Sequence, residues 1–321
     1  QLGSWLRQRG GHGSVCTGSD CDAHSVQGRE ETTGVRENRG KDKLGATKKR
    51  RTGRFFLYLI LILMTLLMMI PFLWMLSASI KARDEVFMME PFRLIPEVPR
   101  WSNYKEIWTR IPLLKFIENT TILTVVVTFL QLLTSSFAAY AFAKLEFRFK
   151  NVLFMGYVAT IALPWQVYMV PQFIMMRKMG LNDKLLSMVC LQAFSAFGVF
   201  MMKQFYEGIP DSLCEAARID GMSEYRIWAK IMLPLSRPAL STLTIFTFVT
   251  TWNDYLGPLI YLKTETKKTV QIGLKMFMGQ YTAEYGLIMA GSAVVLIPVL
   301  IVFLFLQKYF VEGIASTGIK G

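Results

Sequence analysis

The sequence predicts an all-α integral membrane protein with six transmembrane helices and a polar helix-turn-helix segment between two of them. Composition points to a membrane, because 52% of the residues are apolar and only 18% are charged. Six apolar stretches are each long enough to cross a bilayer, which takes a helix of roughly 20 residues. A mostly polar segment, 209–235, separates the fourth apolar stretch from the fifth.

Short or polar connections join the six apolar stretches. The stretches lie near 55–79, 117–143, 151–176, 185–205, 236–262 and 286–310. The first and the last contain runs without any charge, whereas a soluble helix needs a polar face. The third contains Pro164 and Pro171, which a membrane helix tolerates as kinks when neighbouring groups satisfy the freed carbonyls.

Basic residues before the first stretch predict the orientation of the chain. Lys48, Lys49, Arg50, Arg51 and Arg54 precede it closely. Such a cluster stays in the cytoplasm, so six crossings return the C-terminus to the cytoplasm and place 209–235 on the same side. The formal net charge of +13 suits anionic lipid headgroups and gives no reason to expect nucleic acid.

The first 50 residues differ in composition from the rest. They are rich in Lys, Arg and Gly and poor in large apolar residues, so we expect a disordered tail at 1–50 and a permease-like membrane domain at 51–321. The four residues His12, Cys16, Cys21 and His24 have metal-binding side chains, but their spacing is a poor match to a zinc site. We therefore expect no metal and no cofactor.

The segment 209–235 has the signals of two short helices and a tight turn. Asp211 or Ser212 is able to cap the first helix, and Glu215 is expected in its first turn. Asp220-Gly221 is a turn dipeptide, because glycine accepts a positive φ without strain. A second helix is expected from about Ser223 to Met232, ending before Pro234.

The spacing E-A-A-x3-G-x9-I-x-L-P in this segment resembles the coupling loop of ABC-importer membrane subunits. The resemblance implies docking on a separate ATPase, whose motion the loop carries into the membrane. The alternative is an ordinary surface hairpin between two membrane helices. The residues that the resemblance assigns to coupling are Glu215, Ala216, Ala217, Asp220, Gly221, Ile231, Leu233 and Pro234.

Further motifs resemble one branch of that family, the carbohydrate importers with a maltose-type second permease. The run Thr251-Trp252-Asn253-Asp254-Tyr255-Leu256-Gly257-Pro258-Leu259 is similar to the W-N-D-x-x-x-P-L signature of the branch, and the C-terminus ends in Lys-Gly as its members do. The resemblance implies a second permease subunit, two ATP-binding subunits and an extracytoplasmic sugar-binding protein as partners. It also implies a bacterial or archaeal inner membrane.

Trp252, Asn253 and Asp254 are the candidates for the substrate path. An unpaired carboxylate in a membrane is unfavourable, so Asp254 should face protein, water or substrate. One interpretation is that Trp252 stacks on a sugar while Asn253 and Asp254 bond its hydroxyls. The other is that Asp254 is bonded to backbone or to a partner near the helix end. Weaker candidates are Gln131, Ser135, Ser136, Gln192, Ser195, Thr247 and Thr250.

The sequence contains no G-x-x-x-x-G-K-[ST] phosphate loop, so ATP hydrolysis is expected on a separate chain. The two histidines lie in the tail, which excludes histidine-based catalysis in the membrane part. We therefore expect a transport subunit and not an enzyme. An importer of a non-sugar solute, such as an amino acid or osmolyte, is the main alternative, and a membrane enzyme or channel is the less favoured one.

Overall fold

The computed structural model describes residues 54–87, 93–279 and 283–317, with side chains described to residue 308. The predicted tail 1–50 and its His and Cys residues lie outside the described residues. The chain divides into two units, 1–71 and 72–321. No strand occurs in the described part of the chain, where an isolated bridge joins Met278 to Ala283.

The described part of the first unit belongs to one helix, Arg54–Ser79, which continues into the second unit. Every large apolar side chain from Phe55 to Ile70 is exposed on it. A helix that is apolar on all sides is stable next to lipid and not next to water.

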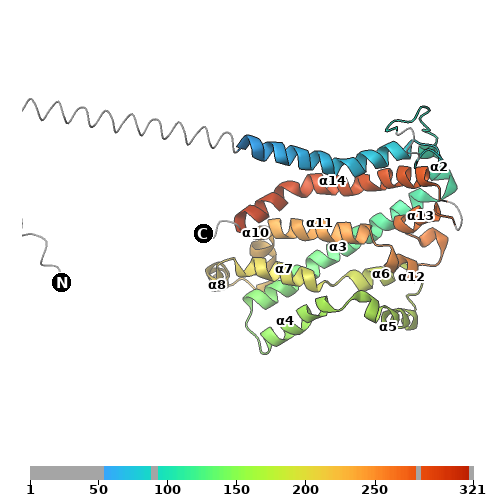
Figure 1. The fold of residues 1–321 in the computed structure, drawn as a ribbon. Helices are drawn as coiled ribbons and strands as arrows, with labels where there is room; N and C mark the ends of the chain where they lie inside the picture. The colour runs from blue at the N-terminus through green and yellow to red at the C-terminus, as the bar shows by residue number, and fades with distance from the viewer. Residues whose placement is uncertain (1–53, 88–92, 280–282, 318–321) are drawn as a thin grey trace, which may run out of the picture. The chain divides into compact units, whose positions relative to one another are not determined.

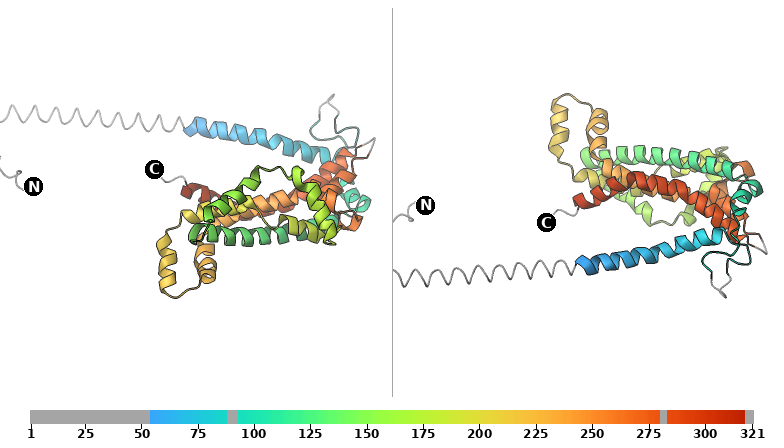
Figure 2. Two further views of the ribbon diagram at one scale, coloured as in Figure 1. Left: turned by 90° about the horizontal axis from the view of Figure 1, so that it is seen from below. Right: turned by 90° about the horizontal axis from the view of Figure 1, so that it is seen from above.

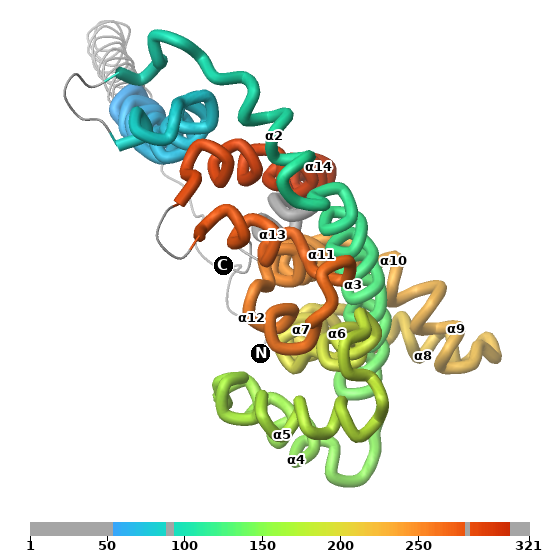
Figure 3. The backbone as a smooth tube through the Cα atoms, turned by 90° about the vertical axis from the view of Figure 1, so that its right-hand side faces the viewer, coloured from blue at the N-terminus to red at the C-terminus, as the bar shows by residue number. Residues whose placement is uncertain are grey.

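The second unit is built on α3 (Leu113–Lys144), the long green helix that crosses Figure 1. Two helices, α7 (Ala196–Glu207) and α11 (Arg237–Trp252), pack along α3. On its other side, α11 packs against α14 (Tyr285–Thr317). The helices α3, α11 and α14 therefore run side by side, as the end-on view in Figure 3 also shows.

The remaining elements are short and lie around these four helices. They are α2 (Asn103–Arg110), α4 (Lys150–Ala159), the 3-10 turn η1 (Thr160–Ala162), α5 (Trp165–Lys178), α6 (Leu185–Gln192), α8 (Asp211–Ile219), α9 (Glu224–Ile227), the π-helix η2 (Trp228–Met232), α10 (Leu233–Leu235), α12 (Leu256–Tyr261), the 3-10 turn η3 (Glu265–Lys267) and α13 (Val270–Met276).

The sequence predicted six membrane crossings, and the described residues contain four to six candidate spans. Four helices are long and apolar enough to span a membrane, and two further pairs qualify only if each bent pair is one span. The third predicted stretch is broken between η1 and α5 by a bend of 102°. Leu163 is extended there, as a residue before proline prefers to be, and Pro164 lacks the N–H that would continue the helix.

The fifth predicted stretch is also interrupted. Its main helix, α11, ends at Trp252, and α12 begins only at Leu256. At its other end, a bend of 80° at Ser236 separates α10 from α11. Membrane proteins tolerate such breaks where the irregular backbone is covered by protein or lines a polar cavity.

Candidate functional site

The segment 209–235, here called the hairpin, consists of α8 and a second helical stretch, Glu224–Leu235, that contains a π turn. It projects beside one end of the bundle, as Figure 2 shows. The turn between its two helical parts has Gly221 at φ 76°. The Gly221 N–H donates to Arg218 O at 3.0 Å and the Met222 N–H to Ala217 O at 3.0 Å, a Schellman motif that satisfies the last carbonyls of α8.

The two faces of α8 differ in what they contact. Cys214 and Ala217 are buried against Ile227 of α9 and the end of α3. Glu215, Ala216, Asp220 and Gly221 are exposed. The side chains of Ile219 and Tyr225 are 85% and 70% exposed, respectively. The hairpin therefore exposes two large apolar side chains, one on each of its helical parts.

In the second half of the hairpin, the other residues of the coupling pattern take mixed positions. Ile231 and Leu233 are half-buried and Pro234 is exposed. The eight pattern residues are therefore not one contiguous exposed patch, because Ala217 belongs to the core of the hairpin while Glu215 and Ala216 face outward.

Charged side chains fasten the hairpin to the last turn of α3. Lys144 Nζ donates to Ile209 O and to Asp211 Oδ1, both at 2.6 Å. Arg218 donates to Glu224 Oε1 at 2.7 Å and to Lys144 O at 3.2 Å. The Tyr140 hydroxyl donates to Glu224 Oε2. Because the Lys144 side chain is only 3% exposed, the attachment is shielded from water on the α3 side.

The hydrogen bond from Lys144 and its positive charge lower the pKa of Asp211. Asp211 is therefore the charged partner of α3, and neither Asp211 nor Ser212, the two cap candidates from the sequence, caps α8. Pro210 occupies the cap position of α8, which has no side-chain capping bond.

Two further details of the hairpin correct the predictions from sequence. Glu215 lies in the second turn of α8 and not in the first. The second helical stretch does not end before Pro234, because helical backbone continues to Leu235. Pro234 therefore lies inside the helical stretch, two residues after the end of the π-helix η2.

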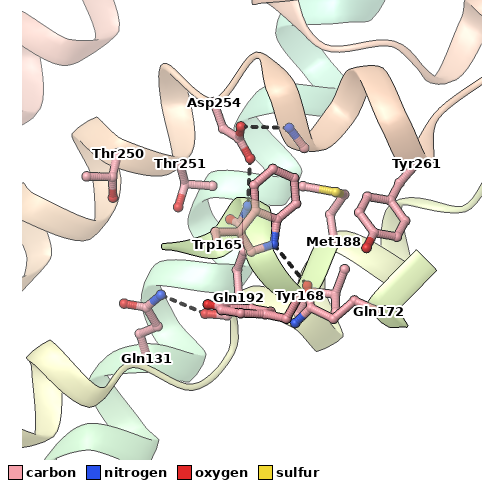
Figure 4. Close-up of a pocket in the computed structure, with 12 residues that line it drawn as sticks. Gln131, Trp165, Tyr168, Gln172, Met188, Gln192, Thr250, Thr251, Asp254 and Tyr261 are labelled. Atoms are coloured by element: carbon pink, nitrogen blue, oxygen red, sulfur yellow. Dashed lines mark hydrogen bonds between the residues drawn. The ribbon is translucent and has the colours of Figure 1, made fainter. Parts of the chain in front are cut away.

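A pocket of about 370 Å³ lies where three helices are interrupted, and Figure 4 shows its lining. Trp165 begins α5 after the break at Pro164, Gln192 ends α6, and Asp254 lies between α11 and α12. We call it the interrupted-helix pocket. Its polar lining residues are Gln131, Gln172, Gln192, Thr250, Thr251 and Asp254, and its aromatic ones are Trp165, Tyr168 and Tyr261.

Asp254 is held by two neutral donors. Its Oδ2 accepts from Gln192 Nε2 at 2.8 Å, and its Oδ1 accepts from the Gly257 N–H at 3.0 Å near the start of α12. Gly257 has to be small, because a Cβ there would lie 2.5 Å from Asp254 Oδ2. The second bond satisfies one of the free N–H groups at the helix start.

Side chains of α3 satisfy the carbonyl groups that the end of α6 leaves free. Gln131 Nε2 donates to Gln192 O at 2.6 Å, and Thr134 Oγ1 donates to Ala193 O at 2.9 Å. Gln131 Oε1 in turn accepts from Thr247 Oγ1 of α11 at 2.9 Å. This amide network joins α3, α6 and α11 beside the pocket.

Two buried polar atoms of the pocket residues have no hydrogen-bond partner in the described part of the chain. They are Gln192 Oε1 and the Tyr261 hydroxyl oxygen. Buried polar atoms are nearly always satisfied, so such atoms beside a cavity indicate groups that a ligand or water would satisfy.

The structure corrects the position of two of the three predicted path residues. Trp252 is 1% exposed, is stacked on Phe248, and donates from Nε1 to Val295 O at 3.2 Å. It belongs to the core and does not line the pocket. Asn253 is exposed and bonds Gln271, also away from the pocket lining. Asp254 alone of the three lines it, because α11 ends between Trp252 and Asp254.

Sequence reasoning missed the aromatic lining and the charged attachment. Pro164 was the signal for Trp165 and Tyr168, because a break in a membrane helix is tolerated where the backbone is covered by protein or lines a cavity. Arg218 and Glu224 stand on either side of the Gly221 turn, and opposite charges so placed indicate a pair across the turn. No cluster of His, Cys, Asp and Glu in the described residues could hold a metal ion.

The chain matches a family of known transport proteins over most of its length. The model described as "Binding-protein-dependent transport system inner membrane component" covers residues 44–316. The arabinooligosaccharides transport system permease protein AraQ of Halalkalibacterium halodurans is 32% identical over 279 residues, which are 85% of this chain and 100% of that protein.

A second relative and a solved structure extend the likeness. The polygalacturonan/rhamnogalacturonan transport system permease protein YtcP of Bacillus subtilis is 30% identical over 288 residues, with 85% of this chain and 100% of that protein covered. A crystal structure of a bacterial ABC transporter involved in the import of the acidic polysaccharide alginate superposes with a TM-score of 0.70 and 27% identity, over 81% of this chain and 98% of that chain.

Proposed function

The chain belongs to the family of binding-protein-dependent transport system inner membrane components, and on that premise we propose which of its parts carry the steps of sugar import. It is a multi-pass membrane protein and the permease subunit of a sugar ABC importer. It is a transport subunit and not an enzyme, and it works with other components of such an importer. The names of its relatives give no support to a non-sugar solute, a membrane enzyme or a channel.

The proposed assembly pairs this chain with a second permease subunit, two ATP-binding subunits and an extracytoplasmic sugar-binding protein. It lies in the inner membrane of a bacterium or archaeon, with six crossings and with both termini and the hairpin in the cytoplasm. The basic residues 48–54 support this orientation.

The orientation is tested by labelling two single cysteines in intact cells. A Ser223→Cys variant should react only with a reagent that is admitted to the cytoplasm, and a Thr266→Cys variant only with an impermeant reagent outside. The reverse pattern contradicts both the orientation and the docking surface proposed next.

The hairpin is the proposed docking surface for an ATP-binding subunit, and α3 carries its motion toward the pocket. The observation that supports this most is the attachment at Lys144, Arg218 and Glu224, which joins the exposed hairpin to the last turn of α3. Ile219 and Tyr225 supply the exposed apolar contacts that a partner would bury. Glu215 on α8 and Asp220, which directly follows α8, are also exposed.

A cross-linking experiment tests the docking proposal. Ile219→Cys in the assembled importer should form a disulfide or a bifunctional cross-link with an ATP-binding subunit. Leu114→Cys, on a residue that is 70% exposed near the other end of α3, is the matched control and should form none. Cross-linking of Leu114→Cys alone contradicts the docking surface.

The interrupted-helix pocket is the proposed contribution of this chain to the translocation path. Interrupted helices near the middle of a membrane domain recur at the substrate sites of transporters, because the freed backbone and polar side chains can face a solute. The volume of the pocket, about 370 Å³, is also within the range of small-molecule binding sites. The relatives named above act on arabinooligosaccharides and on an acidic polysaccharide among others, so the likeness leaves the charge of the sugar open.

A further inference from the structure

We propose that the interrupted-helix pocket accepts uncharged saccharides and rejects saccharides that carry carboxylate or phosphate groups. The inference rests on the proposed role of the pocket in the translocation path. It adds the charge class of the substrate, which neither the fold nor the family determines.

The charge of the pocket comes from a single side chain. Asp254 is the acidic residue among the twelve residues of the lining, which contain no Lys, Arg or His. Each of its oxygens accepts a hydrogen bond from an N–H group, at 2.8 and 3.0 Å, and such bonds favour the charged form of a carboxyl group. Both donors are neutral, and no ion pair in the described part of the chain neutralises it.

The rest of the lining matches hydroxyl groups. Glutamine amides and threonine hydroxyls both donate and accept, which is what a sugar hydroxyl also does. A carboxylate on a sugar only accepts, and proteins usually bind such a group with Arg or Lys. Trp165 and Tyr168 also line the pocket (Figure 4), and an aromatic face suits packing against the apolar face of a sugar ring.

The magnitude of the exclusion follows from Coulomb's law. A second negative charge about 6 Å from Asp254, at the effective dielectric constant near a protein surface, would weaken binding by about 100-fold. A neutral saccharide escapes this repulsion and has its hydroxyls bonded by the same carboxylate. The pocket therefore discriminates mainly by charge and less by the identity of the sugar.

Asp254→Asn is a variant that removes the charge and keeps the shape. The Asn oxygen can still accept from the Gly257 N–H. The Asn amino group can donate to Gln192 Oε1, which has no partner among the described residues, once the Gln192 amide rotates. The variant should therefore fold and assemble, and a change in selectivity would report on charge.

The closing experiment measures the reactivity of a cysteine in the pocket of the complete, purified importer. Thr250→Cys is introduced after the four native cysteines have been replaced, because Thr250 is exposed and lines the pocket. In one arm, cationic and anionic methanethiosulfonate reagents of similar size are compared. In the other, neutral trisaccharides of glucose, galactose and mannose are compared with the matching uronate trisaccharides as protectants.

The proposal predicts that the cationic reagent reacts about 10-fold or more faster than the anionic one after correction for their intrinsic rates, and that Asp254→Asn removes the difference. It also predicts that at least one neutral trisaccharide slows the labelling and that no uronate does at the same concentration. Equal rates for the two reagents, or equal protection by a uronate, overturn the charge inference and leave the path standing. Protection by none of the saccharides, with the reagent ratio as predicted, overturns saccharide binding and with it the proposed path.

Discussion

The hairpin 209–235 and the interrupted-helix pocket are both fastened to α3, but by different kinds of contact. The hairpin is held at the last turn of α3 by ion pairs whose partners reach water, as with Lys144 and the largely exposed Asp211. The pocket is held near the middle of α3 by neutral amide and hydroxyl bonds from Gln131 and Thr134. The two attachments are separated by 13 residues, or about 20 Å of helix.

This difference indicates separate roles for the two regions. A charged attachment at a helix end tolerates water and can be re-formed when a partner moves the hairpin. A neutral network inside the bundle fixes the pocket without adding charge to its lining, which suits the translocation path proposed above. One continuous helix, α3, connects the two regions, so a displacement at Lys144 can reach Gln131 without an intervening hinge.

The largest expected effect comes from Gly221→Val, which forces a β-branched residue to a positive φ. We expect sugar uptake to fall by about 10-fold or more while membrane insertion is unchanged. The matched control is Gly180→Val, because Gly180 also has a positive φ, 69°, and open space around its Cβ position. Co-purification of the ATP-binding subunit and sugar uptake are measured for both variants, and we expect a loss in Gly221→Val alone. Equal loss of the ATP-binding subunit from both variants would contradict a special role of the hairpin turn.

A smaller loss is expected from Gly257→Ala in the pocket. Its Cβ would approach Asp254 Oδ2 to 2.5 Å and the Met188 methyl group to 2.7 Å, so the carboxylate has to leave Gln192. We expect uptake to fall by about 5-fold with the ATPase still bound, in line with overpacking of about 1–3 kcal/mol. Gly156→Ala is the control, since nothing lies within 4 Å of its Cβ position. Loss of the ATPase from Gly257→Ala would mean that the two regions are not separate.

A third effect is expected from Lys144→Met, which keeps the length of the side chain and removes its bonds to Ile209 and Asp211. We expect the importer to assemble and to hydrolyse ATP. The amount of sugar taken up per ATP hydrolysed should fall by about 3-fold, because the hairpin is held less firmly. Lys150→Met is the control, since the Lys150 side chain pairs with the exposed Glu146 one turn earlier in the chain and acts on Asp211 through its charge alone. Equal coupling ratios in the two variants would show that the attachment at Lys144 is not used.

The smallest effect concerns Asp183, in the connection between α5 and α6. Hydrogen bonds from Thr264, first from its hydroxyl and then from its backbone N–H, and from Lys267 hold the pKa of Asp183 well below its usual range. A lowered pKa means that the stabilisation is complete above about pH 4 and is lost as the pH falls further. Asp183→Asn should lower the Tm by about 1–2 °C, equally at pH 6 and pH 8. The control is Asp84→Asn, on an exposed residue. A change in Tm for Asp183→Asn that differs between pH 6 and pH 8 would contradict the lowered pKa of Asp183.

The sequence predicted the hairpin turn well because its signals are local. Asp220-Gly221 requires only its own backbone geometry, and the observed φ of Gly221 agrees with it. The cap at Asp211 was wrong because Lys144, 67 residues earlier, competes for the same carboxylate. Periodicity within one segment contains no information about such a partner.

The pocket was harder to predict for the same reason. Asp254 was identified because a carboxylate in an apolar stretch needs a partner. Trp252 was placed wrongly, because the continuous apolar pattern of 236–262 concealed the end of α11 that turns Trp252 toward α14. The lining comes from five helices in three separate parts of the sequence, and only their packing brings Trp165, Gln192 and Asp254 together.

The most direct test is whether ATP binding by the subunit that docks on the hairpin changes the pocket. The labelling rate of Thr250→Cys is measured in the assembled importer with and without ATP, in the presence and absence of Gly221→Val. The account predicts that ATP changes the rate by about 3-fold or more when Gly221 is present, and that Gly221→Val removes this change without altering the rate in the absence of ATP. An equal response to ATP with and without Gly221→Val would contradict coupling through the hairpin.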